Sequence, residues 1–370
     1  MDDKKICFIM CVNDPVYEAE ALRYVQRLHV PDGYQIEQLS VYEAESMAAG
    51  YQEAMQSTDA KYKVYLHQDT FILNVDFISE MLSVFSQDGT FGMLGVLGGR
   101  TLPQDANCYL CWETGRILAY SGQSLIDGDC FQQEGRSCLE VAAVDGLLIA
   151  TQQDVPWRMD FLDGWDFYDV SQSLEMRKAG YHVVVPYQAQ PWCYHDCGVS
   201  SMKTYDRYRR LMLEQYPEVF AGQVDDKEAA KQQEQLQELE AIRTQMIGWM
   251  EQGAWERLRS FAPYVWKHWP KDTQIREIAN LVEIYVMEET AGKPHSEWFL
   301  LHSWKEIYGC YQAVRFVLIR IACGILDEDA KMLRSKLDQG KITMEAIVKL
   351  ATSSIWNRAV VYQYLWGEQK

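Results

Sequence analysis

Residues 62–69, Tyr62-Lys63-Val64-Tyr65-Leu66-His67-Gln68-Asp69, decide the fold of this chain. The stretch begins as a β-rich run over residues 62–66 and ends abruptly in a polar triplet. A short run of this kind, bounded by polar residues, predicts a buried strand. Ligands of open α/β sheets bind just beyond the carboxyl ends of the strands, so His67-Gln68-Asp69 is a candidate ligand site. The other interpretation makes Asp69 a helix-capping residue in a βα loop.

The elements on either side of this strand alternate in type. The pattern predicts strands over residues 5–12, 34–41 and 91–97, and helices over residues 16–29, 46–56 and 76–85, with Ser46 as an N-cap. This βαβαβα series predicts an α/β fold with a mostly parallel central sheet and helices on both faces. Asn13 and Asp14 then follow the first strand at the same edge of the sheet as His67-Gln68-Asp69.

The next segment of the chain is less regular. Residues 99–137 are poorly periodic and predict an irregular insertion with short strands over the site. After it, the pattern predicts a buried strand over 141–152, a helix over 165–180, a strand over 181–186, a loop over 191–198 and a helix over 200–216. Ala179-Gly180 is a good C-terminal cap for the helix over 165–180.

The character of the sequence changes after Ala221-Gly222. Helical periodicity dominates from there, and the predicted helices cover residues 227–249, 255–266, 274–289, 296–326, 330–337 and 343–365. We therefore expect two domains, an α/β domain over residues 1–222 and an all-α domain over residues 223–370. The helical domain would bind an acceptor or a partner, or form a homo-oligomer.

Composition narrows the classes of function. The 370 residues carry a formal net charge of −18, which argues against a nucleic-acid binder because such proteins need a basic face. No apolar run approaches the ~20 residues that span a bilayer, and the first strand is followed by no cleavage site of a signal peptide. The ten cysteines then indicate reduced thiols in a cytoplasmic protein.

Two further clusters carry candidate chemistry. Residues 163–169 hold three aspartates besides Tyr168 at a predicted helix start, where a carboxylate acts as a general base or merely complements the helix dipole. His195 and Asp196 lie in a Gly-ended loop, where His195 is a candidate metal ligand and Asp196 orients its ring or is merely exposed. The alternative there is a structural zinc site made by four cysteines: Cys108, Cys111, Cys193 and Cys197.

Several common motifs are absent from the sequence. The first strand is not followed by a Gly-x-Gly-x-x-Gly motif or a Gly-Lys-Ser/Thr loop, which weighs against NAD-binding and P-loop proteins. There is also no Gly-x-Ser-x-Gly elbow, so a hydrolase triad is not expected.

The ordered set of segments resembles a family 2-like glycosyltransferase with a GT-A fold. The segments that carry the resemblance are residues 5–12, 46–51, 65–69, 144–146, 163–169, 177–181 and His195. The nearest group is that of streptomycin-biosynthesis-protein-like glycosyltransferases, and the resemblance covers about residues 4–216. The helical domain lies outside it.

The resemblance implies a role for each matching residue. His67-Gln68-Asp69 stands where the family has Asp-x-Asp, so Asp69 would bind Mn²⁺ or Mg²⁺ on the donor diphosphate while His67 replaces the first Asp. His195 would be a second metal ligand. The remaining donor contacts would come from Asn13, Asp14, Ser46, Tyr51, His67, Asp145 and Gly146. The Arg-Asn pair that the family carries near residues 46–51 is absent.

The resemblance also implies a base and an acceptor site. Counting back from residues 177–181 places Asp169 on the family's base, with Asp166 as the rival, and Trp165 and Tyr168 would contact the acceptor. One base and in-line attack imply an inverting transfer from a nucleotide-diphosphate sugar, which we expect to be a UDP-sugar. The acceptor would be a hydroxyl of a glycan, a lipid-linked molecule or a protein, as in polysaccharide biosynthesis. We expect the enzyme in the cytoplasm or at the inner face of the membrane.

Three other functions stay open on the sequence. A non-catalytic GT-A scaffold would bind the nucleotide sugar or assemble a complex, and the altered His67-Gln68-Asp69 motif supports this alternative. A nucleotidyltransferase would need a Gly-rich basic phosphate loop after the first strand, and residues 11–17 contain no such loop. A zinc-stabilised helical adaptor would hold stoichiometric zinc.

Overall fold

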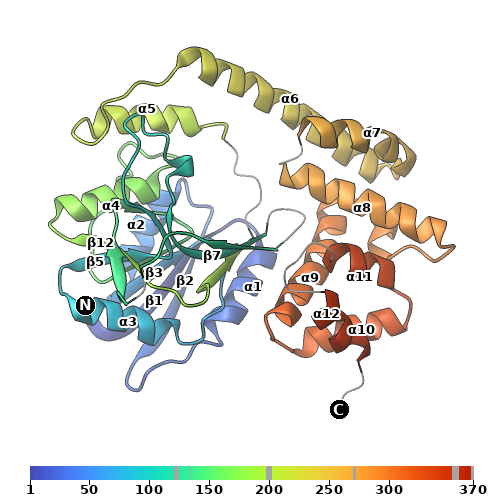
Figure 1. Cartoon of the computed structure of the whole chain (residues 1–370), viewed down its shortest axis with the longest axis horizontal. Helices are drawn as coiled ribbons and strands as arrows, with labels where there is room; N and C mark the ends of the chain where they lie inside the picture. The colour runs from blue at the N-terminus through green and yellow to red at the C-terminus, as the bar shows by residue number, and fades with distance from the viewer. Residues whose placement is uncertain (121–124, 134, 197–201, 270–271, 352–357, 368–370) are drawn as a thin grey trace. The chain divides into compact units, whose positions relative to one another are not determined.

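The computed structural model describes residues 1–120, 125–133, 135–196, 202–269, 272–351 and 358–367 (Figure 1). The chain divides into two compact units. The first contains nearly all of residues 1–231, and the second contains the described part of the helical region from Gln232 onward together with a short segment that begins at Tyr120. None of the helices in the described ranges is long and apolar enough to cross a membrane.

The first unit is built on a seven-stranded sheet with the order β2-β1-β3-β11-β5-β12-β9. Its strands are β1 (Asp2–Val12), β2 (Gln35–Tyr42), β3 (Ala60–Leu66), β5 (Phe91–Gly95), β9 (Cys138–Glu140), β11 (Leu148–Thr151) and β12 (His182–Pro186). Strands β1, β2, β3, β5 and β12 share one direction, and β11 and β9 run the other way. The predicted mostly parallel α/β sheet is confirmed.

Helices cover both faces of this sheet (Figure 1). They are α1 (Pro15–Val25), α2 (Met47–Ser57), α3 (Phe77–Gln87) and α4 (Tyr168–Lys178), and α5 (Tyr205–Gln215) contributes residues to the same core from farther out. Alternate residues of a strand point to opposite faces. Cys7, Ile9 and Cys11 accordingly belong to the core that α2 and α4 complete, whereas the ring of Phe8 lies 6.3 Å from that of Phe77 on α3.

A second sheet has the order β10-β6-β7-β13-β4, with β8 paired to β7. Its strands are β4 (Thr70–Ile72), β6 (Leu97–Gly99), β7 (Thr114–Tyr120), β8 (Leu125–Asp129), β10 (Ala143–Val144) and β13 (Cys193–His195). The short strands expected within residues 99–137 are therefore present. A 3₁₀ turn, Cys108–Leu110, lies in the loop before β7.

Three sequence predictions about local structure in this unit were wrong. Residues 141–152 do not form one strand, because Asp145-Gly146-Leu147 separates β10 from β11 and the two strands join different sheets. Residues 193–195 are a strand, since they pair with β4 in the register His195 to Thr70. Helix α4 begins at Tyr168, later than predicted, because Phe167 has a left-handed φ of 63°.

From Gln232 onward, the elements of the second unit are helical in its described residues, and the first of them, α6, begins six residues earlier. Its elements are α6 (Asp226–Glu251), α7 (Trp255–His268), α8 (Thr273–Thr290), η2 (Glu297–Leu300), α9 (Trp304–Ala322), α10 (Glu328–Asp338), α11 (Met344–Ala351) and α12 (Arg358–Trp366). They bury an aliphatic and aromatic core of their own, which includes Trp298 and Tyr311. The single helix predicted over residues 296–326 was wrong, because a 3₁₀ turn and the non-helical residues 301–303 precede α9. The end of the predicted loop at Cys197 and Gly198, and the start of the helix at Ser200, lie outside the described residues.

Candidate functional site

The candidate site begins with the loop after β3. Gln68, at its centre, accepts hydrogen bonds at Oε1 from the backbone N–H groups of Asn13 and Asp14, at 2.9 and 3.0 Å. Its amide also donates to Asn13 Oδ1 at 2.5 Å. The carboxyl ends of β1 and β3 are thereby held together, as the sequence predicts. Asp14 is also the N-cap of α1, where it accepts from the N–H of Val16 at 2.8 Å.

Strand β13 brings His195 to the same edge. The pairing of His195 with Thr70 places it beside Asp69, and the N–H of Asp196 donates to the carbonyl of Asp69 at 2.8 Å. The buried Asp196 carboxylate accepts from the hydroxyl of Tyr17 at 2.7 Å and from that of Tyr194. Asp196 therefore anchors the end of β13, a role that sequence reasoning had left open.

His67, Asp69 and His195 form one cluster. Asp69 Oδ1 lies 3.3 Å from His195 Nε2 and 3.8 Å from His67 Nδ1, and the three side chains are between 17% and 26% exposed. One ligand atom from each residue lies within 4.8 Å of the other two. Asp69 Oδ1 is buried and accepts no hydrogen bond. Such an atom, facing two imidazole nitrogens, fits the donor set of a divalent cation.

Charge and burial act against each other in this cluster. Burial raises the pKa of Asp69, but the charges of His195 and His67 outweigh it and leave the pKa below its ordinary value. Burial lowers the pKa of His195, yet the Asp69 carboxylate outweighs it and the pKa is raised. For His67 burial dominates and the pKa is lowered. The cluster therefore favours an ionised Asp69.

Tyr168 orients the imidazole ring of His67 through a hydrogen bond. Its ring is 4% exposed, and its hydroxyl hydrogen-bonds with Nε2 of His67, which leaves Nδ1 turned toward Asp69. Gly146 makes room for this contact, since a Cβ atom there would lie 2.0 Å from the Tyr168 hydroxyl. Sequence reasoning assigned Tyr168 to the acceptor, whereas the structure places its side chain against the metal-type cluster.

Two further carboxylates, Asp145 and Asp169, lie near the turn between β10 and β11. Asp145 accepts from the N–H of Leu147 at 3.0 Å, and the carbonyl of Leu147 accepts from the N–H of His67 at 3.0 Å. Asp169, in the first turn of α4, accepts from the N–H groups of Gly146 and Val170 at 2.9 and 2.8 Å. Burial raises the pKa of Asp169 to about 7, and the charge of Asp145 adds to the shift.

The remaining predicted residues lie around these two groups. Ser46 is buried and caps α2 by accepting from the N–H of Ala49, and Tyr51 is fully buried with its hydroxyl on the carbonyl of Leu66 at 3.3 Å. Trp165 is 50% exposed. Asp166 accepts from the hydroxyl of Thr204 at 2.7 Å, and burial raises its pKa. Asp166 therefore makes a different contact from Asp169.

Gln68 and Asp196 are the polar residues whose connecting roles the sequence analysis did not assign. Each is adjacent in sequence to a candidate ligand, but no local pattern indicates that it bridges distant segments. The alternative zinc site finds no grouping in the described residues, where only His67, Asp69 and His195 could hold a metal ion together. Cys197 lies outside the described residues, and the described cysteines are free thiols.

The comparisons with known proteins agree with this architecture. Residues 7–216 match the model of a glycosyltransferase-like family, so the chain belongs to that family. The expected family membership over about residues 4–216 is confirmed, and the structure shows the expected mixed α/β domain followed by a helical region. No curated protein sequence matches the chain.

Similar solved structures include two glycosyltransferases. TarS from S. aureus is 10% identical, with a TM-score of 0.35, over 57% of this chain and 39% of that one. The chain thus spans well under half of that TarS chain. The mannosyltransferase PcManGT from Pyrobaculum calidifontis, in complex with GDP-Man and Mn²⁺, is 10% identical, with a TM-score of 0.38, over 99% of this chain and 88% of that one.

Proposed function

We propose that this glycosyltransferase is metal-dependent and inverting, and moves a sugar from a nucleotide-diphosphate donor to an acceptor hydroxyl. One observation carries the proposal: Asp69 Oδ1, which accepts no hydrogen bond, faces two imidazoles, and a separate half-buried carboxylate, Asp169, lies in the first turn of α4, in a chain of this family. A site that must hold a cation on a leaving diphosphate and remove an acceptor proton needs these two kinds of group.

His67, Asp69 and His195 would hold the cation. Their mixed oxygen and nitrogen donors suit Mn²⁺ and tolerate Mg²⁺. When bound, the cation supplies charge neutralisation for the departing diphosphate. Tyr168 fixes which nitrogen of His67 faces the cluster, and outer partners of this kind raise metal affinity by orienting the ligand. The replacement of the family's first Asp by His67 is thus compatible with metal binding.

Asp169 would be the general base. The acceptor hydroxyl loses its proton to the Asp169 carboxylate as its oxygen attacks the anomeric carbon and the diphosphate leaves from the opposite face. A base works best when its pKa is close to the working pH, and the pKa of Asp169 is about 7. The N–H groups of Gly146 and Val170 hold the carboxylate in place. A single displacement of this kind inverts the anomeric configuration.

The donor nucleotide would lie at the ends of β1 and β3, with Asn13, Asp14 and His67 as contacts and a UDP-sugar as the expected donor. Asp145 and Gly146 would contact the sugar, and the buried Ser46 and Tyr51 would support the floor of this region. Trp165 offers an exposed face to the acceptor, which would be a glycan, a lipid-linked molecule or a protein. The enzyme would then act in polysaccharide biosynthesis, in the cytoplasm or at the inner membrane face. The helical unit would bind the acceptor or a second copy of the chain.

The test is thermal unfolding with UDP, GDP, CDP and ADP, each with and without Mn²⁺. A ligand at 100 times its dissociation constant adds about 2.7 kcal/mol to the free energy of unfolding, which raises the midpoint by a few degrees. We expect one nucleotide to do so only with Mn²⁺, and Asp69→Ala to lose the effect. Asp76→Ala is the control, since Asp76 pairs with His29 at an exposed site, at 2.9 Å.

Two outcomes would change the proposal. If no nucleotide raises the midpoint, the donor-site assignment fails. If a nucleotide binds with Mn²⁺ but neither sugar transfer nor hydrolysis of the matching nucleotide sugar follows, the non-catalytic scaffold becomes the better description.

A further inference from the structure

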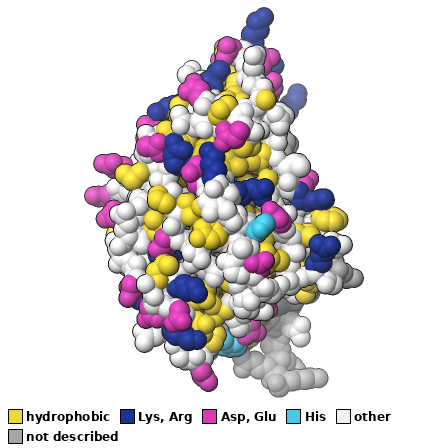
Figure 2. All heavy atoms as spheres, turned by 90° about the vertical axis from the view of Figure 1, so that its left-hand side faces the viewer, with side chains coloured by type: hydrophobic (Ala, Val, Ile, Leu, Met, Phe, Trp, Pro, Cys, Tyr) yellow, Lys and Arg dark blue, Asp and Glu magenta, His cyan; other side chains and the backbone are white. Residues whose placement is uncertain are grey.

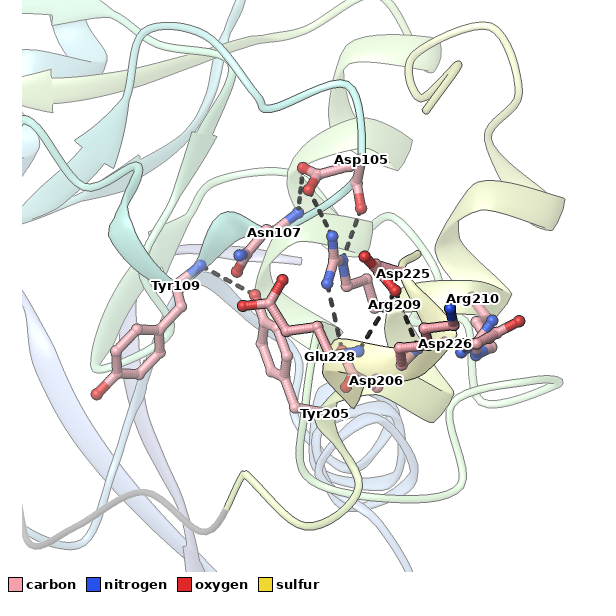
Figure 3. A network of polar contacts seen from close by, with 11 residues as sticks. Asp105, Asn107, Tyr109, Tyr205, Asp206, Arg209, Arg210, Asp225, Asp226 and Glu228 are labelled. Atoms are coloured by element: carbon pink, nitrogen blue, oxygen red, sulfur yellow. Dashed lines mark hydrogen bonds and ion pairs between the residues drawn. The ribbon is translucent and has the colours of Figure 1, made fainter. Parts of the chain in front are cut away.

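The loop formed by residues 104–111 is held to the rest of the first unit at three points, two of which, at Arg209 and Tyr205, are drawn in Figure 3. Arg209 on α5 donates from Nε to the carbonyl of Asp105 at 2.7 Å and from Nη2 to its carboxylate at 2.5 Å. The N–H of Gly222 donates to the carbonyl of Gln104 at 2.8 Å, and a Cβ on Gly222 would lie 2.7 Å from the Cα of Asp105. The hydroxyl of Tyr205 accepts from the N–H of Tyr109 at 2.9 Å.

Arg209 makes this attachment rigid. Its side chain is only 12% exposed, and it also contacts Asp206 at 3.3 Å, so both ends of the guanidinium are engaged. A planar guanidinium with several directed donors fixes geometry better than a single point charge does. The neighbouring Arg210 differs, because its 2.5 Å ion pair is with the exposed Asp226 and does not involve the loop (Figure 3).

The loop presents an exposed aromatic ring that is connected through two further rings to the start of α4. Tyr109 is 51% exposed, and Figure 3 shows its ring pointing away from the Arg209 contacts. The Tyr109 ring meets that of Tyr205 edge-on at 6.4 Å, and the Tyr205 ring lies 4.7 Å from that of Phe167. Phe167 immediately precedes α4, whose first turn carries Asp169. The aromatic series therefore runs from the exposed loop to the start of the catalytic helix.

We propose that Tyr109 is a stacking face for a pyranose ring of the acceptor, and that Arg209 is a positioning residue that holds it there. This inference rests on the proposed function and makes its acceptor a glycan. An aromatic face carries negative charge density, and the axial C–H bonds of a sugar present a weakly positive, apolar face to it. A loop whose backbone is held at three points loses little conformational entropy when a ligand binds to it.

The charges on this part of the surface favour a neutral partner. Two acidic side chains, Asp105 in the loop and Asp206 on α5, already flank Arg209 there (Figure 3). On the face drawn in Figure 2, acidic and basic side chains are interspersed rather than gathered into one basic area. A neutral sugar therefore fits the loop better than a strongly anionic acceptor segment.

The experiment measures binding of methyl glycosides to the whole chain by ligand-observed saturation-transfer NMR titration. The probes are the methyl α- and β-glycosides of glucose, galactose, mannose and N-acetylglucosamine. We expect at least one to bind, and Tyr109→Ala to weaken it roughly 3- to 10-fold, the range of an aromatic contact. Tyr109→Phe should keep the affinity, because the ring and not the hydroxyl makes the contact. Tyr264→Ala, on a ring of 46% exposure in the helical unit, is the control.

Arg209→Met and Arg210→Met form the matched pair for the positioning role. Arg209→Met should weaken the same glycoside about as much as Tyr109→Ala does, whereas Arg210→Met should leave its affinity unchanged. Each variant is first checked for its unfolding midpoint. If Arg209→Met does not fold, the exposed Tyr109 carries the test alone.

The outcomes separate this inference from the proposed function. The inference is overturned if Tyr109→Ala binds like the unmodified chain, or if that chain binds a nucleotide with Mn²⁺ but none of the glycosides. Glycoside binding through Tyr109 in a chain that binds no nucleotide would overturn the proposed function and the acceptor assignment with it.

Discussion

Asp69 and Asp169 are two carboxylates of one site whose pKa values move in opposite directions. Asp69 lies between two imidazoles, and their charges lower its pKa in spite of burial. Asp169 has no basic side chain among the groups that shift it, so burial and the nearby Asp145 raise its pKa to about 7. The environment alone thus separates a carboxylate that stays ionised from one that can exchange a proton near neutral pH.

The difference indicates a division of labour. The ionised Asp69, with an unpartnered oxygen, is suited to bind a cation, while Asp169 is suited to accept a proton. Backbone structure enforces the separation: Asp69 follows β3, and Asp169 is held by the N–H of Gly146 at the break between β10 and β11. Substitutions at Asp69, at Asp169 or at a neighbour of either one should therefore have separable effects, and the largest is expected at Asp169.

Replacement of Asp169 should give the largest loss of activity. Asp169→Asn keeps the size of the side chain but cannot accept the acceptor's proton, so we expect the transfer rate to fall by about 10²–10⁴. Nucleotide and Mn²⁺ affinity should stay near their original values, because Asp169 does not contact the His67–Asp69–His195 cluster in the structure. Initial rates at saturating donor measure the transfer rate, and parallel titrations with nucleotide and with Mn²⁺ measure the two affinities.

Asp166→Asn is the control for this assignment. Asp166 is also partly buried at the start of α4, but it bonds to Thr204 instead of Gly146. Its replacement should reduce the rate less than that of Asp169. The reverse order would transfer the role of base to Asp166.

Replacement of Asp69 should reduce the affinity for the cation. Asp69→Asn removes the ionised oxygen that faces both imidazoles, and we expect Mn²⁺ affinity to fall by at least about 100-fold, beyond what the loss of an outer partner costs. Electron paramagnetic resonance of free Mn²⁺ in a titration measures this without any nucleotide. Unchanged Mn²⁺ affinity would show that the cation binds elsewhere.

The sequence predicts the framework of this site better than its contacts. The placement of Asp69 beyond β3 follows from a local hydrophobic run, and periodicity also finds most helices. The Asp145-Gly146 dipeptide is a turn signal that the single predicted strand over residues 141–152 passed over. The pattern does not show that β10 and β11 join different sheets, because only pairing partners distant in the chain decide that.

The position of His195 was also not predictable from the local sequence pattern. Its segment resembles a loop in sequence, and becomes a strand only because β4 and β7 supply partners on both sides. The contact between Tyr168 and His67 likewise joins residues about a hundred positions apart and needs the absent side chain of Gly146. Local propensity carries no information on such pairings, whereas resemblance to a family did name the residues involved.

Tyr168→Phe should have an intermediate effect. It removes the hydroxyl that bonds to Nε2 of His67 and retains the buried ring. We expect Mn²⁺ affinity to fall by about 10-fold, the lower end for an outer partner of a metal ligand. The same titration measures it, with Tyr65→Phe as a control because that ring is also buried near Tyr51. An equal loss in both variants would indicate a general packing effect.

The smallest effect should be a shift in pH dependence caused by Asp145→Asn. A general base must be deprotonated, so kcat/KM for the unmodified enzyme should rise with pH and level off above about 7, the pKa of Asp169. The negative charge of Asp145 helps to raise that pKa, and its removal should move the rising limb to lower pH by about one unit or less.

The same pKa makes a separate prediction for the metal-free protein. The folded pKa of Asp169 lies above the ordinary value of about 4, so its contribution to the free energy of unfolding is full below pH 4 and is lost as the pH rises through about 7. Denaturant unfolding at pH 5 and pH 8 should therefore show a decrease that Asp169→Asn makes smaller, while His195, whose pKa is also raised, keeps its own share of the decrease. Asp163→Asn, at an exposed carboxylate paired with Arg207, should retain the decrease and leave the rate profile in place. If Asp145→Asn instead moved the rising limb of kcat/KM to higher pH, the like-charge coupling between Asp145 and Asp169 would be wrong. The opposite pKa shifts of Asp69 and Asp169 would then need another cause.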